Sequence, residues 1–191
     1  MFNFLVKPTD MKLFFSLLLS LGFFSVYAQN ALGDSLKQQL VNDWIRAKSY
    51  TQEYLDAMPA GKYGFRPTDS MRTFAQQMLH LSAANAGLAF ISLGVPYAFS
   101  SQNFEKSPAL QNKDSVVYYV NTSYDVVIKG IKNIDPGTFG QVVSWNMPGG
   151  KRTITRLAWL LKAFEHQTHH HAQCTVYFRL LDIRPPAEKL F

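Results

Sequence analysis

Residues 165–173 read Glu-His-Gln-Thr-His-His-His-Ala-Gln and hold four of the five histidines of the chain. On an α-helix, which turns about 100° per residue, His166 and His170 lie one above the other, and Gln173 continues the same row. Neutral imidazoles four residues apart are a common two-point chelate for a metal ion. The stretch therefore predicts two metal ligands, His166 and His170, on one face of a helix.

The other two histidines of the stretch do not share that row. His169 lies about 60° from it, so it could be a ligand partner, a residue that supports a ligand, or a surface residue. His171 points well away from both ligands, and we expect it on a solvated face. Gln173 and His169 are the residues that we predict to orient a ligand or a substrate.

The segment around the histidines has the period of a helix, without Gly or Pro before Pro185. One stripe passes through Trp159, Ala163, His166, His170, Gln173 and Tyr177. It places the two imidazoles on or beside the core-facing side. Polar rings in that position need partners, which favours metal ligation over a solvated polar run.

The first 28 residues have the pattern of a secretory signal peptide. Met11-Lys12 precedes an apolar run over 13–25, and Val26-Tyr27-Ala28 then leads to Gln29. The run is shorter than the roughly 20 residues that a membrane span needs. We expect cleavage after Ala28, with Met11 as an alternative start, and a periplasmic or extracellular protein without a stable membrane span. The alternative is an uncleaved N-terminal anchor.

The remaining residues, 29–191, are enough for one domain with a sizeable core. The chain has one cysteine, Cys174, so no internal disulfide can form. Removing residues 1–28 takes away two lysines and one aspartate, which lowers the formal net charge from +6 to +5. This excess is spread along the chain without a basic stripe or a nucleic-acid motif, so we expect no nucleic-acid partner.

Three further helices are expected before the histidine helix. Asp34 or Ser35 is a good N-cap for the first, which should end at about Met58. Thr73-Phe74-Ala75-Gln76 has the sequence of a capping box and predicts a second helix. His80 lies on that helix at the flank of its apolar stripe. Taken alone, a single flank histidine is more often a hydrogen-bonded structural residue than a ligand.

The second half of the chain adds one helix and a turn. Residues 97–112 are polar and irregular, and a helix then begins near Asp114 or Ser115. Short extended pieces at 142–145 and 151–154 flank a turn. The pattern predicts an all-α four-helix bundle with a short hairpin before the last helix. Metal sites in such bundles form between facing helices, so a third ligand is expected from another helix.

Residues 165–173, with their continuation to Pro185-Pro186, resemble the last helix of the DinB-like, YfiT-like metal-binding superfamily. The family signature resembles His-x-x-His-His-x-Gly-Gln, followed by a segment that ends in Pro-Pro. Phe65-Arg66-Pro67 and residues 73–80 resemble the start of its second helix. The resemblance covers roughly Ser35 to Pro186 and implies a DinB-like bundle as the domain over 29–191.

Carried over by position, the resemblance implies three metal ligands, His80, His166 and His170. Ala172 stands where many members have Gly, and His171 where many have Arg. The resemblance also implies a divalent ion, usually zinc or nickel, and a homodimer. Three histidines leave coordination positions open for water or substrate.

The sequence is compatible with three alternative functions. The first is a metal-dependent enzyme, a thiol S-transferase or a hydrolase, that acts on an unidentified small molecule. The second is a non-catalytic metal-binding protein of the cell envelope, favoured because Gln167 stands where a zinc-protease helix carries Glu and because small thiol cosubstrates are chiefly cytoplasmic. The third is a structural or interaction bundle that binds no metal.

Overall fold

The structure, a computed structural model, describes residues 8–100 and 104–191, with side chains from Ala31 onward and without those of 101–103. Its regular elements are α1 (Pro8–Ala57), α2 (Phe74–Leu93), α3 (Lys113–Asn133), β1 (Val142–Met147), β2 (Gly150–Thr155) and α4 (Arg156–Leu180). Short 3-10 turns lie at η1 (Ala60–Lys62), η2 (Phe104–Lys106), η3 (Pro108–Leu110) and η4 (Pro136–Thr138). This is the predicted all-α bundle with one hairpin before the last helix.

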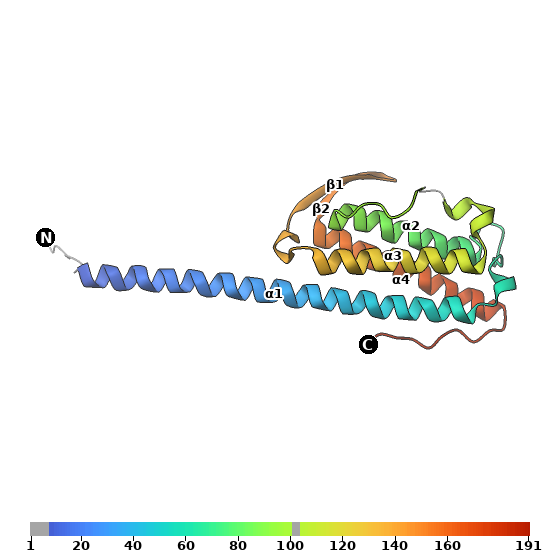
Figure 1. Cartoon of the computed structure of the whole chain (residues 1–191), viewed down its shortest axis with the longest axis horizontal. Coiled ribbons are helices and arrows are strands. Elements are labelled where there is room, and N and C mark those ends of the chain that lie inside the picture. Colours follow the sequence, from blue (N-terminus) through green and yellow to red (C-terminus); the bar gives the residue numbers. More distant parts are fainter. Residues whose placement is uncertain (1–7, 101–103) are drawn as a thin grey trace.

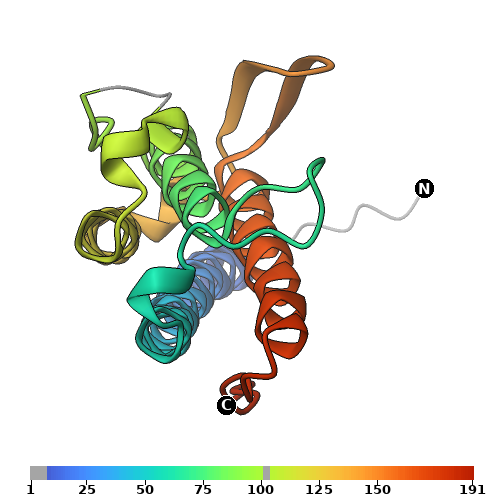
Figure 2. The ribbon, with the colours of Figure 1, turned by 90° about the vertical axis from the view of Figure 1, so that its right-hand side faces the viewer.

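The four helices surround one apolar core (Figure 2). α2 packs against both α3 and α4, and α1 packs mainly against α3. Each helix contributes one inward stripe, as its period predicts. The largest fully buried side chains include Trp44, Tyr54 and Leu55 of α1, Met58 just after it, Phe74, Met78, Leu79 and Leu81 of α2, Tyr124 of α3, and Tyr177 and Phe178 of α4.

α1 begins at Pro8 and not at Asp34 or Ser35, so the predicted start of the first helix is wrong. The weakest helix former near the expected boundary is Gly33, and one glycine costs about 1 kcal/mol relative to alanine. No proline interrupts the helix there, so it continues through the expected cap. The first part of α1 extends beyond the bundle (Figure 1). No helix among the described residues is long and apolar enough to cross a membrane.

The predicted capping box at the start of α2 is confirmed. The Thr73 hydroxyl accepts a hydrogen bond from the Gln76 amide at 3.1 Å, and Gln76 Oε1 accepts one from the Thr73 amide at 3.0 Å. Gly94 ends the helix in the left-handed conformation, with φ 69°. The capping box fixes the first turns of α2, which carry Gln77 and His80.

The segment between α2 and α3 was expected to be irregular, and its described part contains η2 and η3. Phe104 of η2 is buried and stacks on Tyr119 of α3, with ring centroids 4.5 Å apart. η2 also packs against α2. This packing holds Glu105 against the α2 surface that carries His80.

The hairpin of β1 and β2 is antiparallel, with Val143 opposite Ile154, Trp145 opposite Arg152 and Met147 opposite Gly150. Its base is fixed to the bundle because Trp159 donates a hydrogen bond to the Val143 carbonyl at 3.1 Å. β2 runs directly into α4, where the Thr155 hydroxyl caps the helix by accepting from the Ala158 amide at 3.2 Å. The hairpin therefore stands beside the first turns of α4 (Figure 2).

Candidate metal centre

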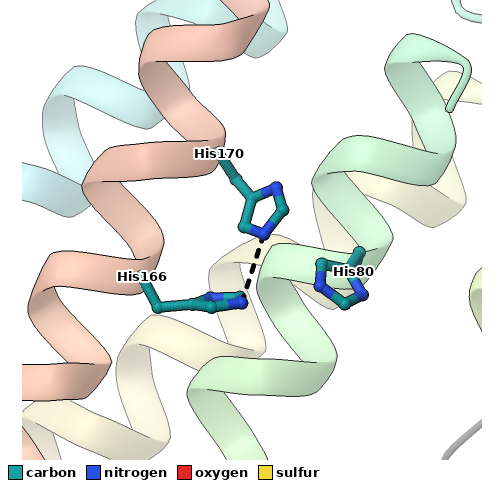
Figure 3. A group of neighbouring side chains, drawn as sticks. All are labelled: His80, His166 and His170. Carbon is teal, nitrogen blue, oxygen red and sulfur yellow. Dashed lines mark hydrogen bonds between the residues drawn. The ribbon is translucent and has the colours of Figure 1, made fainter. Parts of the chain in front are cut away.

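Three histidines meet between α2 and α4 (Figure 3). One ring nitrogen from each of His80, His166 and His170 lies within 4.8 Å of the other two. The Nε2 atoms of His166 and His170 are 3.1 Å apart. Two nitrogens bound at about 2.0–2.1 Å to one tetrahedral ion lie about 3.3 Å apart, so this pair is already near the separation of a chelate.

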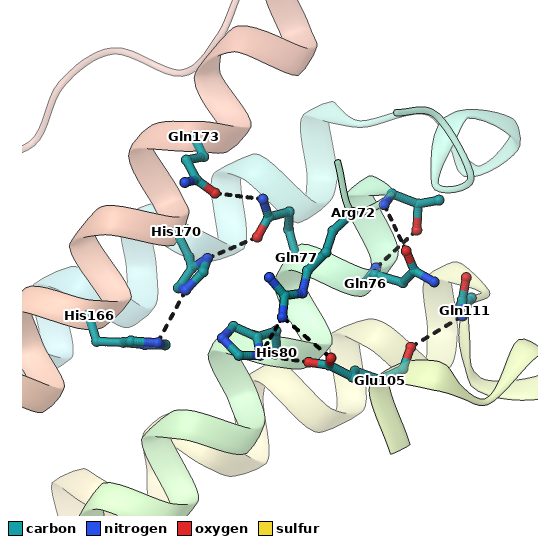
Figure 4. Close-up of polar contacts among 10 residues, drawn as sticks. Arg72, Gln76, Gln77, His80, Glu105, Gln111, His166, His170 and Gln173 are labelled. Carbon is teal, nitrogen blue, oxygen red and sulfur yellow. Dashed lines mark hydrogen bonds and ion pairs between the residues drawn. The ribbon is translucent and has the colours of Figure 1, made fainter. Parts of the chain in front are cut away.

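His170 is held by a residue of α2. Its Nδ1 lies 2.9 Å from Gln77 Oε1, an amide oxygen that can only accept a hydrogen bond. Nδ1 therefore carries the proton, and Nε2 keeps its lone pair for a metal. Gln77 is itself fixed, because its Nε2 donates to Gln173 Oε1 at 2.6 Å (Figure 4).

His80 is held by a carboxylate. Its Nδ1 lies 2.6 Å from Glu105 Oε2, and the other carboxylate oxygen lies 3.5 Å from Nη2 of Arg72. The side chains of His80 and Glu105 are 28% and 16% exposed, so the pair is partly shielded from water. The second ring nitrogen of His80 faces His166 and His170 (Figure 4). A carboxylate behind a histidine is the usual support of a metal-binding imidazole.

Two of the three rings are neutral at pH 7. Burial, with a smaller contribution from His80, lowers the pKa of His166 to about 4. Burial, with smaller contributions from His166 and His80, lowers the pKa of His170 to about 3. The neutral ring is the form that binds a metal. Among the described residues, Nδ1 of His166 is buried without a hydrogen-bond partner, so this ring lacks the support that the other two have.

The two residues predicted to orient a ligand lie next to the cluster. Gln173 Nε2 is 2.9 Å from His169 Nε2, and its Oε1 accepts from Gln77. Gln173 thus reaches His170 through Gln77. His169 is exposed on the side of α4 that faces the hairpin.

The expectation that His171 lies on a solvated face is wrong. It points away from the other histidines, as predicted, but its side chain is buried against two tyrosines of α1. The ring centroids of Tyr50 and Tyr54 lie 4.3 and 3.9 Å from that of His171. α1 covers this side of α4, so a polar residue outside the metal row is still enclosed. Burial lowers the pKa of His171 to about 4.

Neither Gln167, at the position where a zinc-protease helix carries Glu, nor Glu165, the carboxylate just before His166, is directed at the cluster. Gln167 is buried inside the bundle and accepts a hydrogen bond from the Tyr124 hydroxyl at 2.8 Å. Glu165 is exposed and lies 2.5 Å from Nζ of Lys162, whose hydrogen bond lowers the pKa of the carboxyl. Neither residue is placed as a free base beside the three histidines.

A cavity of about 630 Å³ lies beside His166, between the hairpin and α4. This volume is within the range of about 300–1,000 Å³ of small-molecule sites. Most of its walls are apolar. The lining residues are Leu88, Met147, Pro148, Arg152, Ile154, Trp159, Lys162, Glu165, His166 and His169.

The family model described as DinB superfamily matches residues 43–174, more than half of the chain. The chain belongs to the DinB superfamily. A search of curated proteins found no match. Among solved structures, a DinB-like protein from Bacillus cereus ATCC 10987, a crystal structure at 2.01 Å resolution, is similar with a TM-score of 0.66 and 14% identity. The match covers 80% of this chain and 97% of that one, and it shows the fold alone.

The DinB-superfamily chain uses two residues at the cluster that the sequence did not predict, Gln77 and Glu105. Gln77 precedes His80 by three residues on the same helix, a spacing that puts them on one face and could have indicated it. Glu105 lies in a segment without helical period. Its place depends on the packing of η2 against α2, so no sequence signal indicated it.

Proposed function

We propose that this DinB-superfamily protein binds one divalent ion through His80, His166 and His170 and acts as a metal-dependent enzyme. The ion we propose is zinc or nickel, and the reaction is thiol S-transfer or hydrolysis. The observation that carries the proposal is the convergence of three ring nitrogens, two of whose rings are held at Nδ1 by Gln77 and Glu105. Imidazole ligands suit both metals.

The residues of the site have different roles. Gln77 and Glu105 fix the tautomers of His170 and His80, so their metal-facing nitrogens need no rearrangement. The cavity beside His166 gives a small molecule room next to one of the three ligands. A bound ion at such a site supplies a Lewis acid that lowers the pKa of a water or thiol bound to it.

We further propose that the protein works in the periplasm or outside the cell as the chain from Gln29 onward. The signal-like pattern of residues 1–28 supports this location. The family resemblance supports a homodimer as its assembly.

One observation favours a second function, metal binding without catalysis. Glu105 is bonded to His80, Glu165 is paired with Lys162, and Gln167 lies inside the bundle. A hydrolase needs a group that accepts a proton close to the metal. If none is free, the same three histidines would serve to hold or sequester an ion in the cell envelope.

Elemental analysis tests the metal proposal. The untagged protein, purified without chelator, is compared with His80→Ala and with Glu53→Gln as a control, because Glu53 pairs with Lys189 and not with a residue of the cluster. We expect about one divalent ion per chain in the wild type and in the control, and none in His80→Ala. A wild type that holds no ion and takes up neither zinc nor nickel on titration would overturn both metal functions.

A substrate screen separates the two functions. The metal-loaded protein and His80→Ala are assayed side by side with activated esters and with electrophiles plus a small thiol. Turnover that requires His80 supports the enzyme. A full complement of metal without turnover in either class supports the non-catalytic protein.

A further inference from the structure

Arg152 lies on the inner face of the hairpin. Residues that alternate along a strand share a face, and residues paired across two strands share it too. Arg152 therefore lies on the same face as Ile154 and Met147, both partly buried against the core. It also lines the cavity beside His166. The opposite face carries Ser144 and Thr153, which are exposed and joined by a 2.7 Å hydrogen bond.

The charge of Arg152 is not neutralised by the described part of the chain. Its guanidinium makes one hydrogen bond there, to the carbonyl of Lys151 at 3.3 Å, and no ion pair. The other cation of the cavity wall, Lys162, is paired with Glu165 at 2.5 Å. Arg152 is thus the cation of this wall that is available to an anion.

The remaining walls select an apolar body. Leu88, Met147, Pro148, Ile154 and Trp159 line the cavity, and His166 forms part of its edge. A ligand that fills this space buries its apolar surface against the walls. It needs a single negative group to pair with the guanidinium of Arg152. The planar fork of arginine matches a carboxylate in two-point contact.

We propose that the cavity binds a small carboxylic acid with an apolar body, its carboxylate on Arg152 and its body against the apolar walls, beside the metal cluster. This ligand class is the substrate class of the metal site, and in that respect the inference rests on the proposed function. Binding of the acid requires only the cavity and Arg152.

Decanoate is a suitable probe, and Lys151→Gln provides a matched control for Arg152→Gln. Both variants remove one positive charge from neighbouring positions of β2, but Lys151 lies on the outer face of the hairpin. Binding is measured by calorimetry on protein that has received one equivalent of zinc and been freed of excess metal. We expect Arg152→Gln to weaken decanoate binding about tenfold or more, because a charged hydrogen bond is lost, and Lys151→Gln to leave it within about twofold.

Two further ligands test the two ends of the probe. Decanol, which lacks the charge, should bind wild type and Arg152→Gln equally. Hexanoate, with four fewer methylenes, should bind more weakly than decanoate, by roughly threefold to fourfold per methylene at full burial. Equal effects of the two substitutions, no effect of either, or no binding of decanoate would overturn the carboxylate site.

Metal content, measured on the same samples, separates this inference from the metal proposal. One ion per chain together with an Arg152-independent affinity for decanoate would overturn the carboxylate site and leave the metal centre intact. Arg152-dependent binding in a protein that holds no zinc would overturn the metal centre and support the carboxylate site.

Discussion

His170 and His171 are consecutive, and both are buried, but they have different surroundings. His170 faces α2 and the other two histidines, whereas His171 lies between Tyr50 and Tyr54 of α1. Consecutive side chains of a helix are about 100° apart, so the register of α4 alone decides which ring can reach a metal.

Substitutions at these two histidines should have different effects on metal content and on stability. We expect His170→Ala to abolish tight metal binding, because it removes one of three ligands. His171→Ala should keep the metal content but lower the free energy of unfolding by about 1–3 kcal/mol, since it removes a buried ring that packs on two tyrosines. Elemental analysis and urea unfolding measure the two effects. Equal loss of metal from both variants would mean that the assigned helical register is wrong.

Glu105 should tune the affinity for the metal without binding it. Glu105→Gln removes the charge that supports His80, and loss of such a partner typically weakens metal affinity by about 10–100-fold. Competition with a chromophoric chelator measures the change for zinc. Glu53→Gln is a suitable control, because Glu53 pairs with Lys189 and not with a residue of the cluster. An unchanged affinity in Glu105→Gln would show that the carboxylate has no role at the site.

Cys174 provides a probe of unfolding. Its side chain is fully buried, and burial raises the pKa of the thiol. The reactive thiolate is therefore scarce in the folded protein at pH 8, and the thiol should react with a disulfide reagent only when the bundle opens. We expect slow labelling in buffer and immediate labelling in concentrated denaturant. Complete labelling of the folded protein within minutes would contradict the packing around Cys174.

The residues of the metal centre differ in how far the sequence predicted them. His166 and His170 follow from their spacing, because both lie on one helix. His80 was indicated as a ligand only by the family resemblance, since a lone histidine on another helix has no spacing to them. Glu105 could not be predicted, because its contact with His80 depends on where η2 packs.

At the scale of elements, the N-terminal cap of α2 controls the position of His80. Thr73→Ala removes the hydroxyl that accepts from Gln76, and the loss of such a cap costs about 1 kcal/mol. Thermal or urea unfolding should show this loss in full. Thr68→Ala is a control for the substitution itself, because Thr68 lies in the exposed connector before the helix. Equal stability of the two variants would show that the capping box does not stabilise α2.

Helix ends and the hairpin show which elements the sequence determines locally. The capping box is a local signal, and the structure confirms that α2 begins there. The hairpin was predicted from its turn, and it forms with a longer ladder than expected. The predicted start of α1 was wrong because a residue that suits an N-cap does not begin a new helix when the residues before it are themselves helical. The burial of His171 was missed because it depends on α1, a distant element.

At the scale of the molecule, the apolar stripes predicted four helices and a shared core, but not which helices are neighbours. Several bundle arrangements bury the same stripes. The pairing of α2 with α4, which brings His80 to the other two histidines, was implied by the resemblance and is seen in the structure.

The signal-like segment gives a prediction for the whole chain. Expressed in a bacterium that secretes it, the protein should have the mass of residues 29–191. The first buried side chain of the described part of α1 is Leu40, so removal of residues 1–28 should shift the midpoint of thermal unfolding by less than about 2 °C. A fall of many degrees would show that the leading residues stabilise the bundle. An uncut mass would favour the anchor.

The three histidines come from helices that are far apart in the sequence, with α3 and the hairpin between them. A bound ion therefore joins α2 to α4 and stabilises only the folded chain. Above the dissociation constant, each tenfold rise in free ion adds about 1.4 kcal/mol to stability. A chain without its ion would open more often and be cut by proteases more quickly. The abundance of the protein would then follow the supply of the metal.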